Sequence, residues 1–110
     1  QAEIYRNYYA ISTCTSEGLQ SPTIIGAQAA NELLNIKGVK ASFVLTDYQG
    51  KIVISARSID EANVQVVMER MGGGGHMNMA GCQITDKKIP EVIADIKQTL
   101  DQMIEEGELK

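Results

Sequence analysis

The feature that most constrains this chain is a run of four glycines, Gly72 to Gly75, which ends at the only histidine, His76. Ordering polyglycine costs more conformational entropy than ordering any other segment, because glycine loses the most backbone freedom on folding. Such a run inside a compact domain indicates that something approaches the bare backbone closely. Backbone N–H groups without Cβ atoms suit an anion. The pattern therefore favours a loop that holds a phosphate or a nucleotide, with His76 as a further donor or positive charge.

A flexible linker is the alternative, since glycine-rich runs often serve that purpose. The flanking sequence argues against it, because no serine, proline or charge cluster accompanies the glycines and structured sequence resumes at Ala80. We therefore expect the glycines to lie inside one domain that spans residues 1–110. The chain begins with Gln1 and has no initiator methionine. We expect it to be a fragment of a longer, multidomain protein.

Charge and hydropathy exclude some classes of function. The net charge of −4 argues against a broad nucleic-acid-binding face, although a local anion site remains open. No apolar run approaches the roughly 20 residues of a membrane helix, and no signal peptide is visible, so we expect no membrane contact by this chain. Cys14 and Cys82 lie in apolar, strand-like segments without CxxC spacing. They indicate reduced core residues of a cytosolic domain.

The hydrophobic pattern predicts the element order β-α-β-β-α-β-α. Mixed hairpin and crossover connections indicate the α/β class, with a mixed β-sheet and packed helices. The start of the middle helix is open, because Ser58 with Glu61 forms a capping-box pattern while Asp60 is another candidate cap. The expected elements are a strand over 5–15, a helix from Pro22 to Ile36, a hairpin of a half-buried strand over 39–46 and a partner over 51–57, a helix ending at Gly72, a strand over 82–85 and a helix over 89–106.

The end of the second hairpin strand carries polar groups that suit phosphate. Alternation places Arg57 on the face opposite Ile52 and Ile54. Its guanidinium offers a planar fork, while Ser58 adds a hydroxyl and helix N-terminal amides. Asn63, near the same helix start, is a candidate donor to a phosphate or a base edge. Each residue alone has an ordinary structural explanation, and their combination with the glycine run favours a ligand site.

Three segments of the chain resemble those of a known protein family. The segments Ile54 to Ser58, Asn63 to Gln65 and Met71 to His76 are similar to the DHH-associated domain of DHH-family phosphoesterases. The resemblance covers nearly the whole chain in element order. Among these enzymes the chain is most similar to the membrane-anchored bacterial cyclic di-AMP phosphodiesterases, in which this C-terminal domain follows membrane helices, a PAS-like domain, a degenerate cyclase-like domain and a DHH domain.

The resemblance implies a role for each matching residue. Arg57 and Ser58 match an Arg-Ser motif that meets phosphates, and His76 with Gly73, Gly74 and Gly75 matches a Gly-His loop that approaches phosphate and base. Asn63 matches a further motif position. After the loop, many members have Ala-Ala-Gly where this chain has Met79-Ala80-Gly81. Because methionine is larger than alanine, this departure concerns the shape of the base pocket and the exact substrate.

The implied function is substrate binding in a manganese-dependent phosphodiesterase that hydrolyses cyclic di-AMP to linear pApA. Manganese and catalysis would belong to the absent DHH domain. The chain itself would hold no catalytic or metal-ligating residue and would be inactive alone. The parent protein would act at the cytoplasmic face of the cell membrane, and the fragment itself would be soluble.

Two alternatives remain open. One is an oligoribonuclease or pAp phosphatase of the DHH family, which would bind a short oligonucleotide phosphate. The other is a non-enzymatic nucleotide-sensing or dimerisation module. In that case Met103 and Ile104 of the last helix would form a homodimer interface.

Overall fold

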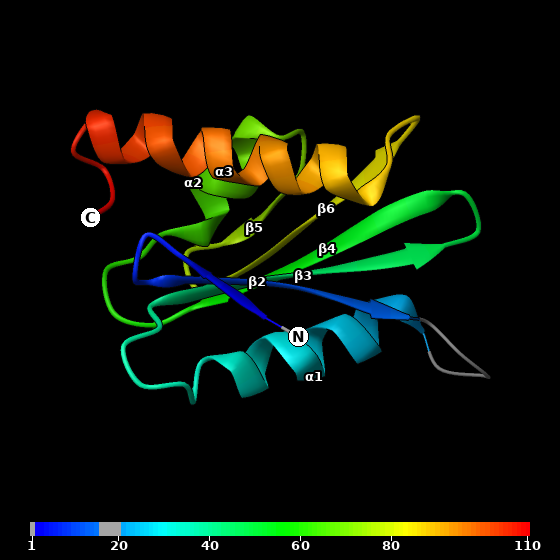
Figure 1. Ribbon diagram of the computed structural model, residues 1–110, viewed down its shortest axis with the longest axis horizontal. Helices are drawn as coiled ribbons and strands as arrows, with labels where there is room; N and C mark the ends of the chain where they lie inside the picture. The colour runs from blue at the N-terminus through cyan, green and yellow to red at the C-terminus, as the bar shows by residue number, and fades with distance from the viewer. Residues whose placement is uncertain (1, 16–20) are drawn as a thin grey trace.

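The computed structural model describes residues 2–15 and 21–110. Its six strands form one mixed sheet in the order β1-β2-β3-β4-β6-β5. Helix α1 covers one face, and α2 and α3 cover the other (Figure 1). The expected α/β fold with a mixed sheet is therefore confirmed. The elements are β1 (Glu3–Tyr5), β2 (Tyr9–Thr15), α1 (Pro22–Leu33), β3 (Ala41–Tyr48), β4 (Lys51–Ser58), α2 (Val64–Arg70), β5 (Gly74–His76), β6 (Met79–Thr85) and α3 (Ile89–Glu105).

The centre of the sheet is buried on both sides. Strand β3 pairs in parallel with β2 and antiparallel with β4, and both Ser42 and Thr46 on its α1 side are fully buried. The sequence predicted a half-buried strand here, which is wrong because α1 covers this face. The helix turns its small residues Gly26 and Ala30 inward, so that it lies close enough for the Ser42 hydroxyl to donate to the Ala30 carbonyl at 2.7 Å.

The main core lies on the other face, beneath α2 and α3. Both helices carry apolar residues at helical spacing, and these residues are buried against the strands. Met103 belongs to this core and is 1% exposed, so it is not available for the dimer interface that the sequence suggested. The buried helical residues are Val64, Val67, Met68, Val92, Ile96, Thr99, Leu100 and Met103.

Three strands and one helix differ from the elements that the sequence predicts. The segment predicted as one strand over 5–15 is a hairpin of β1 and β2, whose turn places Arg6 and Asn7 at positive φ. The glycine run contains β5, and its partner β6 begins at Met79, before the predicted 82–85. The first helix ends at Leu33, before the expected Ile36, because the chain turns there.

Both cysteines are free, and only one is a core residue. Cys82 is buried, and burial raises the pKa of its thiol. Cys14 is half-buried on β2, so the prediction of a core position is wrong for it.

Candidate functional site

An open groove lies where the sheet extends beyond α1. This helix packs against β2, β3 and β4, and the face continues across β6 to β5 (Figure 1). The groove has a volume of about 510 Å³. It is lined by Thr23, Val53, Ile54, Ser55, Arg57, Gly73, Gly74, Gly75, His76, Met79, Ala80, Gly81, Cys82 and Gln83.

One row of large side chains crosses three strands at this groove. Met79 of β6 is paired with Arg57 of β4 on one side and with His76 of β5 on the other. Directly paired residues point to the same face of a sheet. The register therefore brings together an arginine and a histidine that lie 19 positions apart in sequence, with a methionine between them.

The neighbouring row is almost without side chains. Gly81 of β6 is paired with Ser55 of β4 and with Gly74 of β5. Because these positions lie two residues from the first row on each strand, they point to the same face. The row of small residues forms the floor of the groove, and the row of large residues beside it forms a wall.

Arg57 lies on the groove face, as alternation along the strand predicted. Its Nη1 donates to the Ala56 carbonyl at 2.8 Å, while its Nε is buried without a partner. Burial lowers the pKa of Arg57 from its ordinary value, yet an arginine side chain stays protonated in proteins. The guanidinium thus carries a permanent positive charge, and its Nε–H donor has no hydrogen-bond partner.

The second half of the glycine run, Gly74 and Gly75, belongs to the edge strand β5, so only Gly72 and Gly73 form part of the loop that the sequence predicts. Residues 74–76 pair with β6, so part of their backbone takes part in the sheet. A Cβ atom at Gly73 would collide with the Gly81 carbonyl. Gly75, at φ +148°, would place a Cβ 2.6 Å from the Met79 carbonyl oxygen. These two glycines allow β5 to lie against β6.

Gly74 differs from its neighbours. A Cβ atom there would meet no heavy atom within 4 Å, and its φ is not in the left-handed region. The fold does not require a glycine at this position, and glycine weakens a strand relative to residues with side chains. Since Gly74 lines the groove, its missing side chain leaves the backbone open to a ligand.

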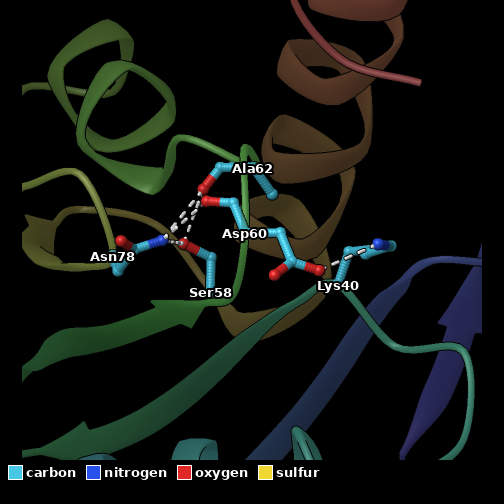
Figure 2. A network of polar contacts seen from close by, with 5 residues as sticks. All are labelled: Lys40, Ser58, Asp60, Ala62 and Asn78. Carbon is cyan, nitrogen blue, oxygen red and sulfur yellow. Dashed lines mark hydrogen bonds and ion pairs between the residues drawn. The ribbon is translucent and has the colours of Figure 1, made fainter.

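Ser58 does not line the groove. It follows Arg57 in the strand, so its side chain lies on the opposite face, where it is 6% exposed. Figure 2 shows its hydroxyl between the Asn78 amide and the backbone of Ala62. The hydroxyl donates to the Ala62 carbonyl at 2.6 Å and accepts from the Asn78 Nδ2 at 2.9 Å. This network ties the end of β4 to the turn between β5 and β6.

Asn63 is the N-cap of α2, and both helix starts considered in the sequence are wrong. Its Oδ1 accepts from the Val66 N–H at 3.2 Å. The chain from Ile59 to Asn63 is a loop in which Asp60 has a φ of +55°. Helix amides therefore do not follow Ser58 directly, and Asn63 does not line the groove.

The groove also contains residues that the sequence did not single out for the site, among them Ser55, Gly81 and Thr23. Alternation with Arg57 was a usable signal for Ser55. The positions from β6 and α1 had no such signal, because only tertiary packing brings them to β4.

No three His, Cys, Asp or Glu side chains in residues 2–15 and 21–110 gather where they could hold a metal ion. In the same part of the chain, no helix is both long and apolar enough to cross a bilayer.

Comparison with known proteins identifies relatives for this arrangement. A family model described as DHHA1 domain matches residues 8–106. The cyclic-di-AMP phosphodiesterase PdeA of Listeria monocytogenes is 44% identical over 100 residues, which cover 90% of this chain and 15% of that protein. GdpP of Geobacillus thermodenitrificans, also named a cyclic-di-AMP phosphodiesterase, is 41% identical over 85 residues, or 76% of this chain and 13% of that protein. The chain thus spans about a seventh of these relatives.

Solved structures support the fold. An exopolyphosphatase-related protein from Bacteroides fragilis matches with a TM-score of 0.74 and 22% identity, over 93% of this chain and 31% of that chain. The C-Ala domain of Aquifex aeolicus alanyl-tRNA synthetase matches with a TM-score of 0.66 and 19% identity, over 91% of this chain and 97% of that one. At such identities the likeness concerns the fold alone.

Proposed function

This chain belongs to the DHHA1 domain family, and from that premise we propose that it binds the substrate of a phosphodiesterase that hydrolyses cyclic di-AMP to linear pApA. The relatives named cyclic-di-AMP phosphodiesterases support this proposal, because their similarity covers most of the chain. Their much greater length leaves room for further domains, and the activity of the whole protein is part of the proposal.

The observation that carries the proposal is the groove with Arg57 on one wall and Gly74 in its floor. An arginine fork binds two oxygens of a phosphate at once. In its present position the guanidinium leaves Nε buried and unpaired, which costs free energy. A rotation that turns the fork toward an anion in the groove relieves this cost. His76, exposed in the same row, adds a donor, and Gly74 lets the ligand approach the backbone.

Ser58 and Asn63 take different roles in this proposal. They position the site: Ser58 donates to the Met77 carbonyl in the turn that follows His76, and Asn63 caps the helix that precedes the glycines. Two manganese ions and the catalytic step belong to a DHH domain outside these 110 residues. The parent protein acts at the cytoplasmic face of the cell membrane. A homodimer of the parent stays a prediction.

The test is the affinity of the full-length parent for cyclic di-AMP with Arg57→Ala and Arg57→Lys. Losing a charge-assisted contact typically costs about 1.5–3 kcal/mol, so Arg57→Ala should weaken binding roughly ten- to a hundredfold. Arg57→Lys should restore only part, because a point charge does not reproduce the fork.

The matched control is Arg70→Ala. Arg70 is exposed, lies outside the groove and pairs with Glu106 and Glu108 at 2.6 Å each. We expect its removal to leave affinity unchanged. If Arg57→Ala binds cyclic di-AMP as tightly as the wild type, the groove is not the phosphate site.

A further inference from the structure

Met79 is an exposed apolar side chain inside a ligand groove. It is 54% exposed, the largest value among the large hydrophobic residues of the described chain. Single exposed hydrophobic residues are common on protein surfaces and need no explanation. Met79 differs from such residues because it lies on the wall of the groove, between the two side chains proposed to meet phosphate.

The spacing of the strands fixes how far these groups are apart. Neighbouring strands lie about 4.8 Å apart, so Met79 is roughly one strand spacing from Arg57 and one from His76. An apolar contact at this distance from a phosphate-binding cation matches the chemistry of a nucleotide, which carries a charged phosphate and a flat base whose faces accept apolar contacts.

The floor beside Met79 has room for a flat ring. The open part of the adjoining row consists of Gly81 and Gly74, which carry no side chains, while Ser55 is only 4% exposed beneath Gly26 of α1. A planar group lying on this row presents its edge or face to the Met79 side chain. Methionine suits such a contact, because its flexible thioether adapts its shape and interacts favourably with aromatic rings.

We propose that Met79 is a base-contacting residue of this groove and packs against the nucleobase of the nucleotide whose phosphate is bound by Arg57. The inference rests on the proposed function and adds to it the group that recognises the base. Met79 should therefore contribute to the affinity of a ligand that has a base and not to the affinity of a ligand that lacks one.

The same hairpin supplies a matched control. Met77 lies two residues before Met79, is 42% exposed and does not line the groove. Its backbone carbonyl accepts from the Val64 N–H, which a change of side chain leaves in place. Met77→Ala therefore removes an exposed methionine from the same turn without touching the proposed base site.

The experiment compares two probes on the full-length parent. AMP and ribose 5-phosphate share phosphate and sugar and differ in the base. Met79→Ala should weaken AMP about fivefold to tenfold, as expected for losing part of one buried apolar contact, and leave ribose 5-phosphate unchanged. Met79→Leu, which conserves volume, should stay within about twofold of the wild type for both probes. Met77→Ala should change neither affinity.

The outcomes separate this inference from the function on which it rests. If Met79→Ala leaves AMP binding unchanged while Arg57→Ala weakens both probes, the base contact is wrong and the phosphate site stands. If Met79→Ala weakens both probes equally, Met79 contacts another domain or shapes the phosphate site, which also overturns the inference. If Arg57→Ala changes neither probe, the proposed function itself fails. Thermal unfolding of each variant checks that the fold is intact.

Discussion

Among individual residues, the glycines before His76 differ in the structural reason for the absence of a side chain. Gly73 and Gly75 lack side chains because β6 lies against them, and Gly75 also has a φ of +148°. Gly74 has open space at its Cβ position. The run therefore combines glycines that the strand pairing requires with one, Gly74, that no neighbouring atom requires and that lines the groove.

Gly74→Val should preserve the fold and damage ligand binding. A β-branched residue is favourable in a strand, and no heavy atom lies within 4 Å of a Cβ at this position. The unfolding temperature of the 110-residue chain should not fall, while the full-length parent should lose affinity for cyclic di-AMP because the new side chain stands in the groove.

Gly75→Ala is the control variant for which we expect a loss of stability. At φ +148° an alanine costs on the order of 1–3 kcal/mol in backbone strain, and its Cβ would also press on Ala80. This variant should unfold at a lower temperature. If Gly74→Val destabilises the chain as strongly and leaves affinity unchanged, then Gly74 serves the fold.

At the scale of elements, a small polar network holds the two halves of the site together. Ser58 ends β4, directly after Arg57, and its hydroxyl contacts the loop before α2 and the turn between β5 and β6. Its backbone N–H donates to the Asn78 carbonyl at 3.1 Å. Because His76 and Met79 flank this turn, the network sets their position relative to Arg57.

Ser58→Ala should lower the free energy of unfolding by about 1–3 kcal/mol, since the Ala62 carbonyl loses its buried hydroxyl donor and the Asn78 amide loses an acceptor. Denaturant unfolding of the 110-residue chain measures this loss. When Asn78→Ala is added to Ser58→Ala, the further loss in free energy of unfolding should be smaller than the loss that Asn78→Ala causes alone. The reason is that the two residues share one network.

The neighbouring ion pair supplies a control for this prediction. Lys40 pairs with Asp60 at 3.1 Å in the same region, as Figure 2 shows, but this pair is open to solvent. Exposed pairs contribute little to stability, so Lys40→Gln should leave unfolding nearly unchanged. An equal effect of Lys40→Gln and Ser58→Ala would contradict the special role of the buried hydroxyl.

At the scale of the whole molecule, the site exists because α1 is displaced toward one side of the sheet. It packs on β2, β3 and β4 (Figure 1). The β6–β5 side of the same face forms the groove. A one-sided, open groove suits a domain that meets a ligand together with another domain. In the proposed function, that other domain is the DHH domain.

The 110-residue chain, given manganese and cyclic di-AMP, should show no turnover, because the proposal places the metal ligands in the DHH domain. A longer polypeptide that includes this domain should hydrolyse the substrate, as measured by release of pApA. Hydrolysis by the short chain at a rate near that of the longer one would show that the catalytic assignment is wrong.

Local sequence periodicity determined much of this protein. The apolar stripes of α2 and α3, the hairpin of β3 and β4, and the position of Arg57 opposite Ile52 and Ile54 all follow from spacings of two or about 3.6 residues. These features depend on neighbours in the chain, so the sequence alone was sufficient to predict them. The glycine run with His76 likewise marks the region of the groove, because a glycine run is itself a local feature of the sequence.

Only the tertiary structure decided which side chains share the groove. The pairing of β5 with β6 turned part of an expected loop into a strand, and it brought Met79 between Arg57 and His76. The packing of the loop before α2 enclosed Ser58 on the opposite face. The pairing of Arg57 with Met79 joins residues 22 positions apart in sequence, and α1 lies farther still from β6 along the chain. Local propensity does not encode such contacts, because it reflects only the nearest neighbours in the chain.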